Sequence, residues 1–229
     1  MDIEIVKETT DFLVVFKPSG IPTVPLKTKK NTTLLDLVAE AKPEVLNING
    51  FHPWEGGVLH RLDTATQGLV LISKNQVFFD FIKEQQYEGK FVKEYFAQLS
   101  SLGHSETSWP ECPFNLKEGQ ICISSYFRPF GKNRGEVRPA LTSTKKNATQ
   151  TTYDTMVKLI SPNKVLCQIS KGFRHQIRCH LAWMDHPIKG DKIYCEKIED
   201  PCDTTLNLSC YKLFIPDYGL ISIDLPSFD

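Results

Sequence analysis

The chain lacks any apolar run long enough to cross a membrane. Its longest apolar stretches, 12–16 and 68–73, have the length of β-strands, whereas a transmembrane helix needs about 20 apolar residues. The first residues, Met1-Asp2-Ile3-Glu4, carry acids instead of the basic start of a secretory signal, so we expect no such signal. These absences predict a protein that does not enter a membrane.

Closely spaced cysteines are also missing. The 7 cysteines include no Cys-x-x-Cys pair, and their odd number argues against a complete disulfide framework. The spacing also argues against a zinc site built on neighbouring thiolates, so we expect no bound metal. Gly-rich phosphate loops of the P-loop or Rossmann kind are absent, and we expect no cofactor. Reduced thiols are typical of a cytoplasmic protein, which is the compartment we expect.

A net excess of charge is absent too, because 27 basic residues balance 27 acidic ones. The distribution is nevertheless uneven. Residues 128–146 hold six basic residues against one acid, and 171–192 hold five against two, whereas 196–229 hold two against seven. Basic segments of this kind can form a face that attracts phosphates even when the total charge is zero. The alternative is that 128–146 is an ordinary solvated loop.

The remaining composition is that of a globular protein, with 41% hydrophobic and 10% aromatic residues. A chain of 229 residues can form one full-sized domain with a core of its own. No internal repeat or low-complexity linker interrupts it. We therefore expect a single domain over 1–229.

Strand patterns outnumber helical patterns and do not alternate with them. Alternating or continuous apolar segments predict strands over 3–6, 12–16, 69–72, 93–99, 121–127, 151–160, 164–170, 207–214 and 220–225. Helical patterns occur over 33–40, after Asn75 and over 174–184, with Thr32 or Thr33 and Asn75 as N-caps. This order predicts an α+β fold, a mainly antiparallel mixed β-sheet flanked by helices.

The segment of most chemical interest is His60-Arg61-Leu62-Asp63-Thr64-Ala65-Thr66-Gln67-Gly68, directly before an apolar strand. Polar and charged residues at the end of a buried strand often form sites. Thr and Gly residues around Asp63 offer hydroxyl and backbone donors that would hold its carboxylate ionised. An aspartate in such a loop is often only a turn former or a helix cap, so both interpretations stay open at this point.

A second segment, 172–182, is rich in hydrogen-bond donors at the start of its predicted helix. Arg174 and Arg178 are spaced i, i+4, which predicts that they share one helix face. The amino end of a helix also favours anions. His175 and His180 stand five residues apart and would not face each other, which argues against a metal site. The alternative is a basic amphipathic helix with a solvated face.

Five blocks of the sequence, in order, resemble the RluA-type pseudouridine synthases. They are Lys17-Pro18-Ser19-Gly20-Ile21-Pro22, His60-Arg61-Leu62-Asp63, Lys93-Glu94-Tyr95, His175-Gln176-Ile177-Arg178 and Pro187-Ile188-Lys189-Gly190-Asp191. The closing segments 207–213 and 224–226 also resemble the last strands of that family. The resemblance covers nearly the whole chain, and 100–145 is the part that matches least.

This resemblance implies an enzyme with the pseudouridine synthase catalytic fold, which isomerises uridines in structured ribosomal or transfer RNA. It implies no cofactor, no metal and no obligate protein partner. Asp63 corresponds to the essential carboxylate, Tyr95 to the tyrosine that stacks beneath the target base, and Arg178 to the arginine that pairs with the aspartate. The residues it implies in substrate binding are Arg61, Ile177, His60, Arg174 and Gln176.

The chain departs from the family pattern at two places and in one larger feature. The usual Gly-Arg-x-His-Gln is Gly172-Phe173-Arg174-His175-Gln176 here, and Gln67 stands where serine is common. Because the chain starts at the first catalytic strand, we expect no small N-terminal S4-like RNA-binding domain, which many relatives carry.

Two alternatives belong to other functional classes. A catalytically silent RNA-binding or RNA-folding module would be favoured by loss of Asp63, Tyr95 or Arg178, and all three are present. A glycosidase needs a second carboxylate across the scissile bond. Within the matching blocks only Glu94 and Asp191 could supply it.

Overall fold

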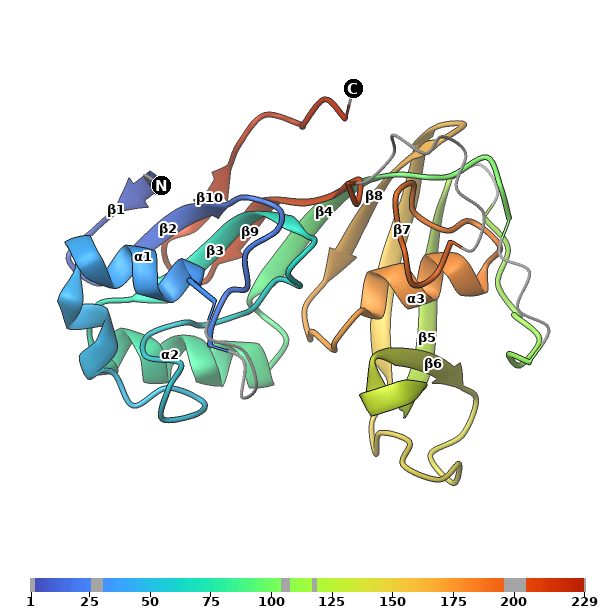
Figure 1. Ribbon diagram of the computed structural model, residues 1–229, viewed down its shortest axis with the longest axis horizontal. Coiled ribbons are helices and arrows are strands. Elements are labelled where there is room, and N and C mark those ends of the chain that lie inside the picture. The colour runs from blue at the N-terminus through green and yellow to red at the C-terminus, as the bar shows by residue number, and fades with distance from the viewer. Residues whose placement is uncertain (1–2, 26–30, 104–107, 117–118, 196–204, 229) are drawn as a thin grey trace. The chain divides into compact units, whose positions relative to one another are not determined.

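The computed structural model describes residues 3–25, 31–103, 108–116, 119–195 and 205–228 (Figure 1). The chain divides into two compact units, Met1–Lys93 with Ser209–Pro226 (unit 1) and Glu94–Leu208 with Ser227–Asp229 (unit 2). Cys202 and the start of the acidic run, 196–204, lie outside the described residues.

The sheet of unit 1 has the strand order β1-β2-β3-β9-β10. Its strands are β1 (Glu4–Glu8), β2 (Phe12–Lys17), β3 (Gln67–Ser73), β9 (Leu208–Ile215) and β10 (Gly219–Ser222). Neighbours pair antiparallel except β3 and β9, which pair in parallel. Nearly every side chain of β2 and β3 is buried, as expected for strands that are continuously apolar.

The two α-helices of unit 1 begin where the sequence predicts. Helix α1 (Leu34–Ala41) starts after Thr33, whose side chain accepts from the Asp36 N–H at 3.2 Å, and Asp36 returns the contact in a capping box. Helix α2 (Gln76–Tyr87) starts after Asn75, whose Oδ1 accepts from the Phe78 N–H at 2.9 Å. Phe78 stacks on Phe12 of β2 with ring centroids 4.9 Å apart, and this contact joins α2 to the sheet.

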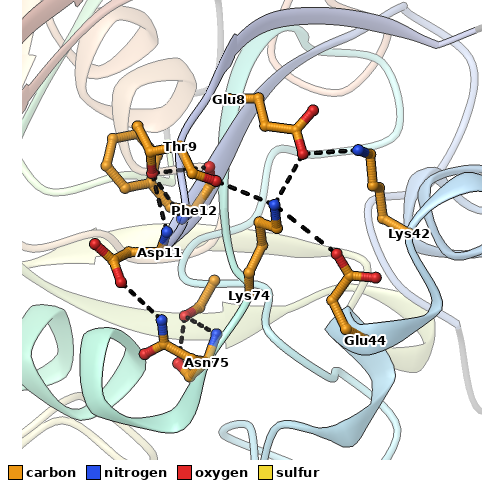
Figure 2. A network of polar contacts seen from close by, with 9 residues as sticks. Glu8, Thr9, Asp11, Phe12, Lys42, Glu44, Lys74 and Asn75 are labelled. Atoms are coloured by element: carbon orange, nitrogen blue, oxygen red, sulfur yellow. Dashed lines mark hydrogen bonds and ion pairs between the residues drawn. The ribbon is translucent and has the colours of Figure 1, made fainter.

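Figure 2 shows the polar network that ties the β1–β2 turn to both helices. Glu8 accepts hydrogen bonds from Lys42 Nζ at 2.7 Å and from Lys74 Nζ at 2.8 Å. Asn75, the cap of α2, also donates to Asp11 at 2.9 Å. The hydrogen bonds from Lys42 and then Lys74 lower the pKa of Glu8. Because this cluster is solvated, it adds little to the stability of the fold. Its main effect is to hold the β1–β2 turn against the two helices.

The sheet of unit 2 has the order β4-β8-β7-β5-β6. Its strands are β4 (Val92–Gln98), β5 (Gln120–Phe130), β6 (Glu136–Ala140), β7 (Tyr153–Ser161) and β8 (Lys164–Ile169). β5 pairs antiparallel with both β6 and β7, and β7 with β8. β6 was not predicted and lies within 128–146, so this basic segment is not a loop throughout.

The helix predicted over 174–184 is shorter than expected. Helix α3 spans Gln176–Trp183, and the preceding His175 has a left-handed backbone with φ 55°. Arg174 is therefore outside the helix and exposed, whereas Arg178 is buried. The prediction that the two arginines share a helix face is wrong. Every residue of α3 is buried, so the alternative of a helix with a solvated face is wrong as well.

The fold class itself is confirmed. The described residues form α+β architecture with three α-helices. Six of its strand pairs (β1–β2, β2–β3, β9–β10, β5–β6, β5–β7 and β7–β8) are antiparallel, and β3–β9 is parallel. Across the same residues, no helix combines the length and the apolar character that membrane crossing requires.

Candidate active site

Asp63 lies in the loop before β3, and the segment 17–23 holds the backbone of that loop. Four carbonyls in succession accept hydrogen bonds: Leu62 from Thr23 Oγ1 at 2.8 Å, Asp63 from the Thr66 N–H at 3.0 Å, Thr64 from the Gly20 N–H at 2.8 Å, and Ala65 from Ser19 Oγ at 2.8 Å. Thr23 Oγ1 in turn accepts from the Leu62 N–H at 3.1 Å. The backbone that carries Asp63 is thus fixed on both sides of the residue.

Lys17 joins the same loop through a fully buried ammonium group. Its Nζ donates to the carbonyls of Pro18 at 2.9 Å, Ile21 at 2.8 Å and Thr64 at 3.3 Å. Three acceptors match the three protons of an ammonium. Burial lowers the pKa of Lys17 to about 8, and the charge of Asp63 opposes that shift. A cation therefore stands close enough to Asp63 to interact with its carboxylate.

Gly68 closes the Asp63 loop because no other residue fits there. Its φ is 121°, in a region that side-chain-bearing residues rarely adopt. A Cβ at this position would also lie 2.2 Å from the Cys210 carbonyl oxygen. The glycine thus lets β3 and β9 approach closely at the base of the loop.

The other two residues of the first matching block, His60 and Arg61, have different surroundings. Arg61 has a side chain that is 58% exposed, and its Nη1 donates to Oε1 of the buried Glu55 at 2.7 Å. His60 Nε2 accepts from the Leu71 N–H at 3.1 Å. Burial, and next the charge of Lys93, lower the pKa of His60 well below its ordinary value. His60 is therefore a neutral side chain that supports β3, while Arg61 reaches solvent.

In unit 2, Arg178 is held by a buried carboxylate. Its Nε donates to Asp191 Oδ2 and its Nη2 to Asp191 Oδ1, both at 2.7 Å. Asp191 Oδ1 also accepts from the N–H groups of Ile193 at 2.9 Å and Tyr194 at 3.2 Å. Sequence reasoning assigned no such partner to Arg178. The signal was available, because Asp191 ends the fifth matching block.

Tyr95 and Ile177 are both buried, in β4 and α3 respectively. The resemblance implies that Tyr95 stacks beneath the target base and that Ile177 is an apolar residue lining the pocket, and a buried position suits both roles. Tyr95 belongs to unit 2, and so does Arg178.

Gln176 and Arg174, predicted to bind substrate, make contacts within unit 2. Gln176 is buried, donates to the Asp154 carbonyl at 2.9 Å and accepts from the Phe173 N–H at 2.9 Å. Its amide supports the start of α3. Arg174 is exposed and donates to the carbonyls of Arg134 and, at 3.0 Å, Glu136. Arg174 thus belongs to the surface next to the basic segment 128–146.

The remaining predicted chemistry concerns thiols and metals. Cys112, Cys122, Cys167, Cys179, Cys195 and Cys210 are free thiols. Within the described ranges, no group of three or more His, Cys, Asp or Glu side chains could hold a metal ion.

Comparison with known proteins identifies the class. A family model for RNA pseudouridylate synthase matches residues 11–183, more than half of the chain. This range includes the Asp63 loop, Tyr95 and Arg178. The chain belongs to the RNA pseudouridylate synthase family.

Individual relatives agree with this assignment. The chain is 28% identical over 196 residues to "Uncharacterized RNA pseudouridine synthase YlyB" of Bacillus subtilis, covering 85% of this chain and 58% of that protein. It is 27% identical over 201 residues to "Ribosomal large subunit pseudouridine synthase D" of Nitrosomonas europaea, covering 87% and 52%. The chain thus spans little more than half the length of these relatives.

A solved structure shows the same fold. "Human RNA Pseudouridylate Synthase Domain Containing 1" superposes with a TM-score of 0.67 at 21% identity, covering 99% of this chain and 84% of that one. At this level of identity the likeness concerns the fold alone.

The buried Lys17 predicts a measurable pH effect. Its folded pKa of about 8 lies below the ordinary value of 10.5, so between these two pH values the unfolded chain binds the proton more tightly. The contribution of Lys17 to the free energy of unfolding therefore increases as pH rises through this window. In Lys17→Met, the free energy of unfolding should lack this increase between pH 7.5 and pH 9.5, as measured by chemical denaturation. An identical pH dependence in wild type and variant would contradict the assignment.

Proposed function

We propose that this protein converts uridine to pseudouridine in structured RNA, with Asp63 as the catalytic carboxylate. The observation that carries the proposal is the fixed backbone around Asp63, within a chain that the family model matches across that loop. Catalytic groups must be held within a fraction of an ångström of their working position. The hydrogen bonds that fix the backbone on both sides of Asp63 provide this precision.

The reaction suits a carboxylate. Pseudouridine forms when the N1–C1′ bond of uridine breaks, the uracil turns, and C5 bonds to C1′. An ionised carboxylate can attack C1′ or take a proton from the sugar, and both routes stay open. Because the target base is stacked in folded RNA, it must first be extruded into the protein.

Tyr95 and Arg178 are proposed to act on the same nucleotide as Asp63. Tyr95 would stack on the uracil and stand near C5, where a proton must finally leave. Arg178 would pair with the catalytic carboxylate, as the resemblance implies. The bidentate contact with Asp191 supports this role because it fixes the plane of the guanidinium.

Ribosomal RNA is the first substrate to test, because the Nitrosomonas relative is named for the large ribosomal subunit. Transfer RNA is the second. The six free cysteines of the described part fit the proposed cytoplasmic location. Of the two carboxylates that a glycosidase could use, Asp191 is disfavoured, because its oxygens already accept hydrogen bonds from Arg178 and the backbone.

Asp63→Asn should abolish pseudouridine formation while RNA binding persists. The amide keeps the size of the side chain but can neither attack C1′ nor accept a proton, and one fewer negative charge should not weaken phosphate binding. Tritium release from C5-labelled RNA measures the reaction, and filter binding measures affinity. Turnover by a clean preparation of this variant would remove Asp63 from the mechanism. Absence of turnover by wild type on both ribosomal and transfer RNA would reject the proposed activity.

Tyr95→Phe should keep base stacking but remove the hydroxyl proposed to stand near C5. We expect slow or stalled product formation with RNA affinity close to wild type in the same two assays. Loss of affinity with unchanged turnover of bound RNA would instead make Tyr95 a binding residue only.

The basic segment 128–146 offers a test of RNA binding, and the structure shows which of its basic residues are exposed. Arg138 is buried, donates to Ser108 Oγ at 2.6 Å and lies 3.3 Å from the centre of the Phe130 ring. It is therefore part of the fold of unit 2. Lys132 and Arg134 are exposed and remain candidates for phosphate contact.

Replacing Lys132 and Arg134 with Ala should flatten the slope of log affinity against log salt by up to about two units, because each phosphate contact contributes close to one. The rate at saturating RNA should hardly change. Lys7→Ala with Lys83→Ala, two exposed lysines of unit 1, is the matched control. Equal slopes in both double variants would show that Lys132 and Arg134 belong to an ordinary solvated surface.

A further inference from the structure

An exposed aromatic cluster lies on the loop that precedes the Asp63 block. Trp54 is 42% exposed and Phe51 is 43% exposed. The Trp54 indole stacks on the exposed His52 ring, with centroids 5.0 Å apart and an interplanar angle of 15°. Large aromatic surface of this kind, left accessible on one loop, is a feature of binding surfaces.

The backbone of this loop is fixed, so it presents its aromatic rings in one arrangement. The N–H of Gly57 donates to the Val45 carbonyl at 2.8 Å, and the Gly57 carbonyl accepts from the Ser73 N–H of β3 at 2.7 Å. A Cβ on Gly56 would lie 2.6 Å from the Val45 oxygen, and one on Gly57 would lie 2.2 Å from the Ser73 oxygen. Glycine is thus required at both positions for the loop to pack this closely on unit 1.

The same loop holds an exposed cation through Glu55. Glu55, the residue after Trp54, is buried and accepts from Arg61 Nη1 at 2.7 Å, whereas the Arg61 side chain is 58% exposed. Asp63 follows Arg61 by two positions. The loop, the exposed guanidinium and the proposed catalytic carboxylate all belong to unit 1 and are joined by short connections.

We propose that Trp54, stacked on His52, is a platform for an unpaired RNA base near the target uridine, with Arg61 beside it for the phosphate backbone. This inference rests on the proposed function for its substrate. Stacked aromatic side chains together with arginine are how proteins bind single-stranded nucleic acid. An RNA strand fits better than an apolar protein surface, because Glu55, the residue after Trp54, pairs with an exposed cation.

The experiment measures binding of the full-length protein to fluorescent 12-nucleotide oligouridine and oligoadenylate, alongside the RNA that it modifies. Trp54→Ala should weaken binding by about tenfold, within the range for one base stacked on an aromatic ring. It should leave the rate at saturating RNA close to wild type. Trp54→Phe should recover most of the affinity, because it restores an aromatic ring. Tyr87→Ala, which removes another aromatic residue of unit 1 that is 82% exposed, is the control.

A second arm places an abasic nucleotide at each position flanking the target uridine. At one of these positions, wild type should bind the abasic RNA about as weakly as Trp54→Ala binds the intact RNA. Trp54→Ala should bind the abasic and intact RNAs equally, because both changes remove the same interaction. If Trp54→Ala binds every RNA as tightly as wild type does and still forms pseudouridine, the platform is overturned and the proposed function stays intact. Weaker strand binding by Trp54→Ala in a protein that modifies no RNA would support the platform and reject the proposed function.

Discussion

A buried ammonium group organises the loop on which the proposed chemistry depends. Burying a charge is strongly unfavourable unless hydrogen bonds replace its hydration. Lys17 meets this condition with the carbonyls of Pro18, Ile21 and Thr64, which belong to two segments far apart in the sequence. If the ammonium group lost its hydrogen bond to any of these carbonyls, a buried cation would be left with an unsatisfied N–H donor. The turn after β2 and the loop around Asp63 therefore keep one arrangement relative to each other.

Unit 2 uses the opposite charge for a similar purpose. Asp191 is a buried acid whose oxygens accept from Arg178 and from two backbone N–H groups. A buried ion pair adds little net stability, but removing one partner leaves an uncompensated charge. In both units, then, a residue with no proposed part in the reaction fixes a residue that has one. The positions of functional side chains depend on these supporting groups as much as on the strands and helices that carry them.

The basic segment 128–146 shows how neighbouring charges in a sequence can have different roles. Arg138 lies on β6, inside the fold, and stacks over Phe130. Lys132 and Arg134 lie in the short 3-10 helix before that strand and are exposed. A count of charges along the chain treats these three residues alike, because it contains no information on which side chains the fold buries.

The amino-acid sequence by itself determined the α+β class, the cap at Asn75 and the family, and it narrowed the cap of α1 to Thr32 or Thr33. These depend on local periodicity, on contacts within a few residues, and on motif order. The tertiary structure alone decided the shortened start of α3, the burial of Gln176, and the pairings of Arg178 with Asp191 and of Arg61 with Glu55. His175 has a left-handed backbone immediately before α3, which no helical pattern reveals. Each ion pair joins residues outside the local helical and strand spacings, so its partner depends on which distant segments the tertiary fold brings together.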